Sequence, residues 1–428
     1  MENNLNRLAT FRALKEEIRG SADHLLVGID VAKDRHHSFF GTPTGKTLRK
    51  RFVFDNTRAG IDQLLTLADD LQTRHGLTRR VFGLEPTGIY HKPLLENLLQ
   101  RGETAVLVSN VAVARNRELL DGRWDKNDTA DSANVTDLLA QARCLFADVP
   151  GAELRELRHL VSARVRYKKA EHALRMRIRN HVVAQFFPEL DRAYAQGGQD
   201  TIVLAVIRNG IDPREIAGME FEAFWNQIAA PRWGKAQQPR VRAVWEAAKV
   251  SIGCVMDDAV RWEAPHLVEQ LDGLRSDLRD LELRMHTAAQ RMPGYRCVTS
   301  IPGVGPVLAA MILAAIGDPR RFQHPRQVLR LAGLDLCASR SGKSSDRAVP
   351  KISKQGKGGL RFALVQASII ASRTNAATRT YFSHLLQGRE QERGIKLKMH
   401  VKMAAKLLVV AWTLMKRDET FDPAIFMS

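Results

Sequence analysis

The sequence predicts a mixed α/β domain at the front of the chain and largely helical structure after it. Three observations support this fold class. Between residues 24 and 150, short runs rich in valine and isoleucine alternate with segments of helical periodicity. Residues 151–190 and 256–291 carry long helical patterns. Residues 296–428 open on a turn rich in glycine and proline and include the apolar helix expected at Val401–Met415.

The length and the charge of the chain indicate a folded protein of several domains with a polyanionic partner. The 428 residues suffice for two to three domains of about 150 residues each. Hydrophobic residues make up 44% and charged residues 26%, which excludes a wholly disordered chain. Lysine and arginine number 65 against 47 acidic residues, so the net charge of +18 predicts a polyanionic partner, most often nucleic acid. A basic surface that serves only solubility is the alternative.

Cysteine usage and hydropathy indicate a cytoplasmic protein without a membrane segment. The four cysteines are far apart and form no CxxC pair, so neither a zinc knuckle nor a disulfide framework is expected. The longest purely apolar run, Val307–Ile316, is too short to span a bilayer. The first residues mix both charges and lack the apolar core of a signal peptide, so we expect a helical or loose arm over residues 1–23.

The front domain, residues 24–150, is expected to hold a mixed sheet. Its first three strands follow one another with only turn residues between them, which favours an antiparallel meander. Helices separate the later strands, which implies parallel pairing there. The expected order is three strands, helix, strand, helix and strand, at residues 24–32, 37–41, 48–54, 61–71, 80–85, 93–99 and 104–108.

The middle of the chain, residues 151–295, predicts a helical coiled-coil region with an insertion. The leucines of the second helical stretch lie close to heptad spacing, so the two stretches are expected to form an antiparallel pair. Residues 191–250, which lie between them, are expected to form an inserted helical subdomain. Residues 153–181 hold nine lysines and arginines against three glutamates, which is compatible with a nucleic-acid partner.

Four carboxylates form the first candidate site. Asp30 follows the first strand, Glu85 ends a later one, and Asp128 and Asp131 share one face of an expected helix. If they converge, a divalent cation must offset their repulsion. Oxygen ligands favour Mg²⁺ or Mn²⁺, and a pair of such ions suits phosphodiester chemistry. Spacing alone leaves an ordinary structural role open for these acids, and other acids are in range, namely Asp34, Asp121, Asp125 and Asp137.

Three segments resemble a known family. VGIDVAKDRHH, FGLEPTGIYH and KNDTADS occur in this order and look like the N-terminal domain of the DEDD transposases of the insertion sequence one-ten family. The resemblance implies a domain similar to the RuvC resolvase, within the ribonuclease H fold. It also implies that Asp30, Glu85, Asp128 and Asp131 bind the metal and that Asp125 does not. Ser132 stands where the family usually has alanine, and both residues are small.

The segment PGVGP predicts a tight turn between two helical segments. Gly303 and Gly305 would let the backbone approach a phosphate, and the amides at the following helix start favour an anion. An ordinary packing corner between helices is the alternative. The turn resembles the hairpin of a helix-hairpin-helix, which grips the DNA backbone without reading bases. In the family it marks the start of the C-terminal transposase domain, here residues 296–428.

A basic segment rich in serine follows. Residues 338–361 carry seven lysines and arginines against one aspartate. Such a segment suits either a solvated arm that contacts phosphates or a serine nucleophile supported by cations. The chemistry alone favours none of the serines at positions 339, 341, 344 and 345. The family carries a Ser-Gly pair before a segment like ISKQGKGGLRFAL, which implies Ser341 as the nucleophile. Expected nucleic-acid contacts are Lys343, Lys354 and Arg361.

The resemblance implies a bacterial, nucleoid-associated recombinase of a mobile element that acts on donor and target DNA. Its acids and its serine would meet in a composite site, with a covalent phosphoserine intermediate and an element-encoded guide RNA that pairs with the DNA. Strand exchange at two ends needs several protomers, so we expect a dimer that pairs into a tetramer. The rival interpretations are a RuvC-like junction resolvase that hydrolyses with the four acids alone, and a non-catalytic binder of structured DNA.

Overall fold

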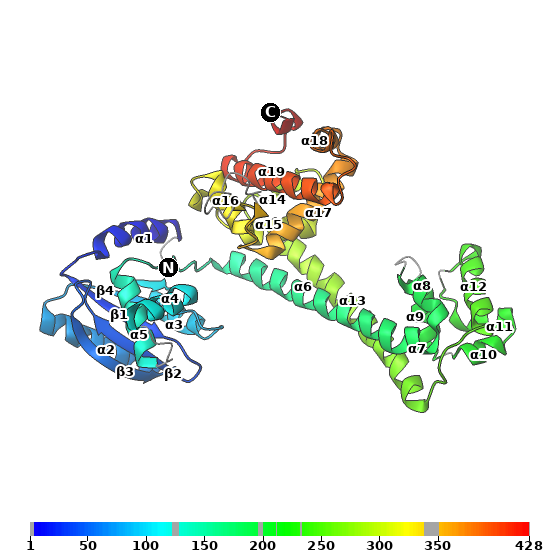
Figure 1. Cartoon of the computed structure of the whole chain (residues 1–428), viewed down its shortest axis with the longest axis horizontal. Helices are drawn as coiled ribbons and strands as arrows, with labels where there is room; N and C mark the ends of the chain where they lie inside the picture. The colour runs from blue at the N-terminus through cyan, green and yellow to red at the C-terminus, as the bar shows by residue number, and fades with distance from the viewer. Residues whose placement is uncertain are drawn as a thin grey trace, which may run out of the picture. The chain divides into compact units, whose positions relative to one another are not determined.

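The computed structural model describes residues 4–121, 128–195, 200–210, 212–231, 233–337 and 351–427. They form two compact units, Met1–Gly151 and Ala152–Ser428 (Figure 1). Within these ranges, none of the helices combines the length and the apolar character that a membrane crossing requires.

The first unit contains a five-stranded mixed sheet in the order β3-β2-β1-β4-β5. The first three strands pair antiparallel, whereas β4 pairs parallel with β1 and β5 parallel with β4. The predicted meander and the predicted parallel crossovers are therefore confirmed. The strands are β1 (His24–Asp30), β2 (Arg35–Gly41), β3 (Thr47–Asp55), β4 (Arg79–Leu84) and β5 (Ala105–Leu107).

Helices cover both faces of this sheet, so the central strand β1 is apolar nearly throughout. Leu25, Val27 and Ile29 of β1 face one core with α2 (Arg58–His75) and α3 (His91–Gln100). Leu26 faces the other core, which contains residues of three helices. These are α1 (Asn4–Ile18), α4 (Asn110–Asp121) and α5 (Asp128–Ala140).

Helix α1 occupies most of the segment that we expected to be a helical or loose arm. Its Leu14 and Ile18 are buried in the second core, and Arg7 donates a hydrogen bond to the carbonyl of Ala147. The segment is thus packed as part of the first unit. Its polar and apolar residues follow no strong helical stripe, which is why the sequence did not distinguish a docked helix from a loose arm.

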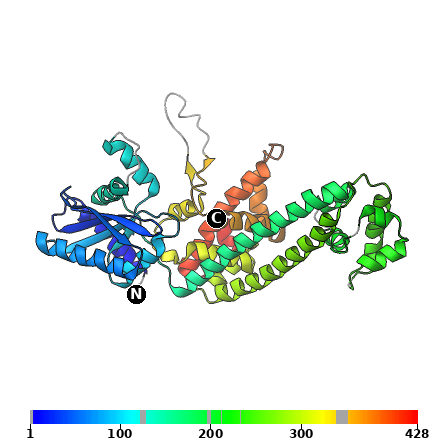
Figure 2. The ribbon, with the colours of Figure 1, turned by 90° about the horizontal axis from the view of Figure 1, so that it is seen from below.

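The second unit is built on two long helices, α6 (Ala152–Arg177) and α13 (Asp258–Gln290). They lie side by side (Figure 2). Their ion pairs run in opposite chain order, which makes the helices antiparallel, as predicted. These pairs are Glu156–Arg291, Arg164–Glu282, Glu171–Arg275 and Arg177–Glu263.

An inserted helical subdomain separates these two helices in the chain. A π-helical turn at Ile178–Val183 ends α6, and the helices that follow pack around their own core, to which α13 contributes Leu267, Val268 and Leu271. The helices are α7 (Ala184–Phe186), α8 (Pro188–Ala195), α9 (Asp200–Arg208), α10 (Pro213–Ala217), α11 (Phe221–Ile228) and α12 (Gln238–Lys249).

The C-terminal part packs around α15 (Pro306–Ile316), of which residues 309–316 are all buried. Helix α19 (Ile395–Arg417) begins earlier than the predicted Val401. Exposed lysines interrupt its first turns, although Ile395 and Met399 are buried there. The other elements are α14 (Tyr295–Thr299), α16 (Pro325–Ala332), β6 (Leu336–Cys337), β7 (Lys351–Ile352), α17 (Gly358–Thr374), α18 (Ala376–Leu386) and α20 (Pro423–Met427).

Candidate active site

Asp30 and Glu85 lie at the adjacent ends of two parallel strands. Ile29 of β1 pairs with Leu84 of β4, and the Glu85 amide donates a hydrogen bond of 3.1 Å to the Ile29 carbonyl. Side chains alternate along a strand, so Asp30 shares the face of Leu26, which packs against α5. Glu85 shares the same face by the same alternation along β4. Both carboxylates are half-buried.

Two strand glycines allow α5 to lie directly on the backbone below these acids. A Cβ atom at Gly28 would stand 2.3 Å from Thr136 Oγ1 and 2.4 Å from the Ser132 carbonyl oxygen. A Cβ atom at Gly83 would stand 2.5 Å from the Leu139 side chain. Only glycine permits this approach of helix to strand. The close packing fixes α5, the helix that begins at Asp128, over the ends of β1 and β4.

Asp131 is buried under α4. Its side chain is 2% exposed and accepts a hydrogen bond from Arg117 of α4, with which it forms an ion pair. Asn116 of α4 donates to Asp137 of α5 at 3.0 Å and holds the same two helices together. Asp128 is the first residue of α5, and its side chain lies outside the described part of the chain, as does all of Asp125.

The described acids do not form a complete metal centre by themselves. In the ranges that the structure describes, no group of three or more histidine, cysteine, aspartate or glutamate side chains is arranged to hold a metal ion. Asp30 and Glu85 follow neighbouring positions of two paired strands, on the same face of the sheet. The carboxylate of Asp131 forms an ion pair with Arg117. The side chain of Asp128 is not described, so the structure does not test its place in the expected quartet.

Sequence reasoning missed two residues at this site. His37 of β2 stands directly opposite Asp30 of β1 in the strand register, and it is half-buried on the same face of the sheet. The alternation along the predicted strand at residues 37–41 could have pointed to it. Arg117, the partner of Asp131, comes from α4, a helix that the sequence pattern did not predict, and no local signal links the two residues.

Ser341 and Lys343 lie outside the described residues. The segment that contains them, residues 338–350, is bounded by a two-stranded antiparallel ribbon. Leu336 of β6 pairs with Ile352 of β7, and Cys337 pairs with Lys351. Cys337 and Lys351, the residues that flank the segment, are therefore neighbours. This ribbon was not predicted, because each of its strands is only two residues long.

Lys354 and Arg361 occupy different environments. Lys354 is exposed and has a left-handed backbone, with φ of 56°, and its amide donates to the Gly333 carbonyl. Arg361 is half-buried, and its guanidinium donates a hydrogen bond of 2.7 Å to the Ala332 carbonyl at the end of α16. Arg361 thus has a structural partner, whereas the Lys354 ammonium is open to solvent.

The two glycines of the PGVGP turn also differ. Gly303 has φ of 82°, and a Cβ atom there would stand 2.3 Å from the Ala367 carbonyl oxygen of α17, so this position is a packing corner. Gly305 caps α15, is exposed, and has no atom within 4 Å of its virtual Cβ. The helix start at Gly305 is therefore the part of the turn that an anion can reach.

Comparison with known proteins identifies the family. Residues 27–188 match the family model of the DEDD transposases of the IS110 type, and residues 295–383 match the model described as "Transposase IS116/IS110/IS902 family". The chain belongs to the IS110 family of DEDD transposases. It is thus an enzyme of the transposase and recombinase class, and its DEDD domain indicates dependence on a divalent metal.

Relatives of the transposase support this assignment over most of its length. The "Insertion element IS110 uncharacterized 43.6 kDa protein" of Streptomyces coelicolor is 25% identical, over 93% of this chain and 95% of that protein. The "Mini-circle putative transposase for IS117" of the same species is 24% identical, over 74% of this chain and 77% of that protein. The "Pilin gene-inverting protein" of Moraxella bovis is 25% identical, over 45% of this chain and 56% of that protein.

The ion pair between Arg117 and Asp131 leads to a stability prediction for the transposase. Replacing Arg117 by alanine leaves the carboxylate of Asp131 buried without its cation, so we expect the free energy of unfolding to fall by roughly 3 kcal/mol. Urea denaturation without divalent metal measures this loss. Arg117→Lys, which keeps the charge, should lose less.

An exposed ion pair of the same unit is the matched control. Arg74 and Asp70 of α2 lie 2.8 Å apart with side chains 69% and 40% exposed, so Arg74→Ala should cost less than about 1 kcal/mol. Equal losses for the two variants would show that burial of Asp131 does not govern the effect.

Proposed function

We propose that the transposase cuts and rejoins DNA with a metal-bound acidic quartet and a serine nucleophile that becomes a covalent phosphoserine. The quartet is Asp30, Glu85, Asp128 and Asp131, and the nucleophile is Ser341. The observation that carries the proposal is the meeting of Asp30 and Glu85 at the adjacent ends of β1 and β4. The DNA substrate follows from the transposase family.

The residues at the strand ends suit a divalent cation. Two half-buried carboxylates on one face of a sheet offer the hard oxygen ligands that Mg²⁺ and Mn²⁺ prefer. A bound cation would offset the negative charge of the scissile phosphate. Within the chain, the charge of the buried Asp131 is paired with that of Arg117.

The serine step transfers a phosphoryl group without loss of bond energy. The Ser341 oxygen forms a bond to phosphorus, the bond from phosphorus to one DNA oxygen breaks, and the serine proton leaves with that DNA hydroxyl. Rejoining is the reverse attack on the phosphoserine by a DNA hydroxyl. Lys351 and Lys354, exposed beside the segment that contains Ser341, are suitable cations for the developing charge.

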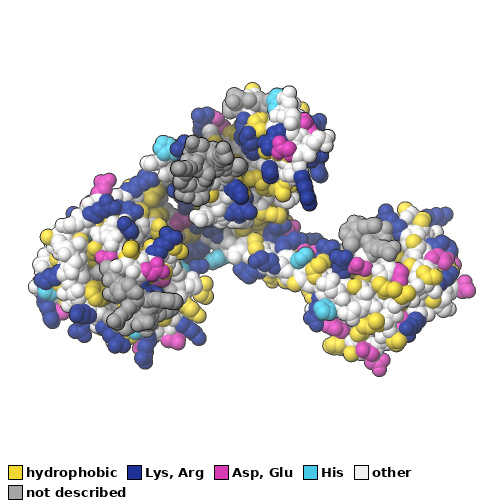
Figure 3. All heavy atoms as spheres, viewed as in Figure 1, with side chains coloured by type: hydrophobic (Ala, Val, Ile, Leu, Met, Phe, Trp, Pro, Cys, Tyr) yellow, Lys and Arg dark blue, Asp and Glu magenta, His cyan; other side chains and the backbone are white. Residues whose placement is uncertain are grey.

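The proposal also includes an oligomeric state and a guide RNA. Strand exchange joins two DNA ends, so we expect dimers of the transposase to pair into a tetramer on DNA. An element-encoded guide RNA would supply target recognition by base pairing. The net charge of +18 and the lysine and arginine side chains spread over the visible faces of both units favour polyanionic partners (Figure 3). Sequencing the RNA that co-purifies with the transposase tests the guide.

A protein–DNA adduct is the decisive product. The wild-type transposase with Mg²⁺ and end-labelled DNA should give a labelled band that keeps the mobility of the protein on a denaturing gel. Ser341→Ala should lose this band, because alanine has no oxygen to bond to phosphorus. Ser339→Ala and Ser344→Ala are matched controls and should keep it. Cleavage by Ser341→Ala at the wild-type rate would instead indicate a resolvase that hydrolyses with the acids alone.

A further inference from the structure

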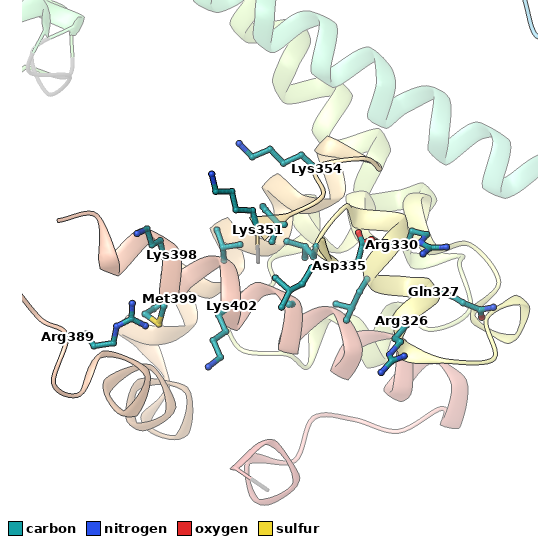
Figure 4. A pocket seen from close by; sticks show the side chains of 16 residues that line it. Arg326, Gln327, Arg330, Asp335, Lys351, Lys354, Arg389, Lys398, Met399 and Lys402 are labelled. Carbon is teal, nitrogen blue, oxygen red and sulfur yellow. Dashed lines mark ion pairs between the residues drawn. The ribbon is translucent and has the colours of Figure 1, made fainter. Parts of the chain in front are cut away.

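The C-terminal part of the second unit contains a groove. Of the residues that line it, only Lys351 and Lys354 take part in the proposed chemistry. The groove encloses a volume of about 1400 Å³ between α16, the β6–β7 ribbon and α19 (Figure 4). We propose that this groove binds the sugar–phosphate backbone of duplex DNA and leads it to the ribbon. The proposal rests on the proposed function in naming DNA as the polyanion and in taking Ser341 as the nucleophile.

The charge of the groove is the first argument. Its described lining carries a single acid, Asp335, which accepts a hydrogen bond from Ser353 and lies 3.9 Å from Arg330. The cations come from α16, from the ribbon and its continuation, from Arg389 in the segment before α19, and from α19. They include Arg326, Arg330, Lys351, Lys354, Lys398 and Lys402.

Most of this charge is uncompensated. Arg326, Lys351, Lys354 and Lys402 form no ion pair with any residue that the structure describes, and all four are exposed. Cations placed on separate elements around one groove repel one another. The negative phosphates of a nucleic-acid backbone neutralise them, and the counterions that the backbone releases on binding add to the affinity. The arrangement therefore fits a polyanion that runs along the groove.

The floor of the groove determines which kind of nucleic acid fits. Among the described lining residues, the uncharged side chains are aliphatic apart from Met399 and Gln327, and none is aromatic. Unstacked bases need aromatic faces, so a single strand has no platform here. Aliphatic side chains offer no donors to base edges either, so the apolar part of the lining reads no sequence. Both properties favour the backbone of a duplex.

The position of the groove favours DNA as the occupant. Leu336 and Ile352, which pair across the ribbon, are part of the lining, and the chain between them contains Ser341. A duplex held along α16 and α19 would therefore pass beside the two ends of the segment that carries the proposed nucleophile. The groove would orient the DNA, and the serine would act on it.

Binding without chemistry tests the groove. Full-length transposase is titrated into a fluorescent 30-base-pair DNA duplex in EDTA, and anisotropy is followed from low to high salt. Lys402→Glu should weaken binding about tenfold and lower the salt slope by about one, as for the loss of one phosphate contact. Lys396→Glu is the matched control, since Lys396 lies on the same helix, is exposed and does not line the groove. The affinity of Lys396→Glu for the DNA duplex should lie within about twofold of the wild-type affinity.

Other outcomes overturn the proposal. If Lys402→Glu loses affinity for an RNA duplex of the same sequence but not for DNA, the groove is an RNA site. If Lys402→Glu binds both the DNA and the RNA duplex as tightly as Lys396→Glu does, the groove binds another partner, such as an acidic protein segment. Ser341→Ala should bind DNA normally in EDTA. Failure of the adduct experiment together with weak binding by Lys402→Glu would reject the nucleophile and keep the groove.

Discussion

Replacing Asp30 by asparagine should lower DNA cleavage by about a hundredfold or more, without lowering the melting temperature of the transposase. The substitution keeps the size of the side chain and removes the charge that a cation needs. Asp30 is half-buried at the end of β1, where a neutral amide can take its place without a new clash. The rate of cutting of labelled DNA, measured with saturating Mg²⁺, gives the effect.

Asp34 provides the control for this experiment. It is exposed, follows β1 by only four residues, and carries the same charge. Asp34→Asn should therefore cleave at the wild-type rate. Calorimetric titration with Mn²⁺ adds a reading that does not depend on turnover, because Asp30→Asn should bind the ion more weakly than Asp34→Asn. Full recombination by Asp30→Asn in cells would instead support the non-catalytic DNA binder.

Gly28→Ala should destabilise the first unit by about 3 kcal/mol, a fall of roughly 10 °C in its melting temperature. The added carbon would meet Thr136 Oγ1, the Ser132 carbonyl oxygen and the Thr136 amide, all within 2.6 Å. Two of these are backbone atoms, so the strain is relieved only by moving α5 as a whole. Because α5 carries Asp131, cleavage should fall as well. Differential scanning calorimetry measures the stability.

Two variants show whether this packing is the cause. Gly151→Ala, at an exposed position with no atom within 4 Å of the virtual Cβ, should change the free energy of unfolding by less than about 0.5 kcal/mol. Gly28→Ala combined with Thr136→Ala should recover only part of the loss, since the backbone contacts remain. Complete recovery would mean that the threonine hydroxyl alone sets the distance between helix and strand.

The sheet could be predicted from local patterns. The change from strand to helical periodicity sets where each element begins, and a helix between two strands implies a parallel crossover. That rule predicts parallel pairing of the later strands, but the adjacency of Asp30 and Glu85 depends on β4 pairing with β1, which the rule does not specify. The exact placement of Asp131 does not follow from local patterns either, because its partner Arg117 comes from another helix and the two meet only through tertiary packing.

The C-terminal features could be predicted less well. The groove combines α16 with α19, which are more than sixty residues apart in the chain, and no periodicity reports such a contact. The turn at PGVGP could be predicted from its composition, yet composition could not show that Gly303 packs on α17 while Gly305 stays open. Which glycine of a turn packs against another helix, and which stays open to a ligand, can be known only from the folded structure.

The antiparallel course of α6 and α13 has a consequence for how this chain could be shortened or extended. The chain leaves the helix pair near Arg177 and returns near Glu263, and these two side chains form an ion pair, so entry and exit are neighbours. A short turn could close this gap at little cost in loop-closure entropy. Removing the subdomain would, however, expose Leu267, Val268 and Leu271 of α13, which are buried in its core, so a shortened chain needs polar residues at these three positions.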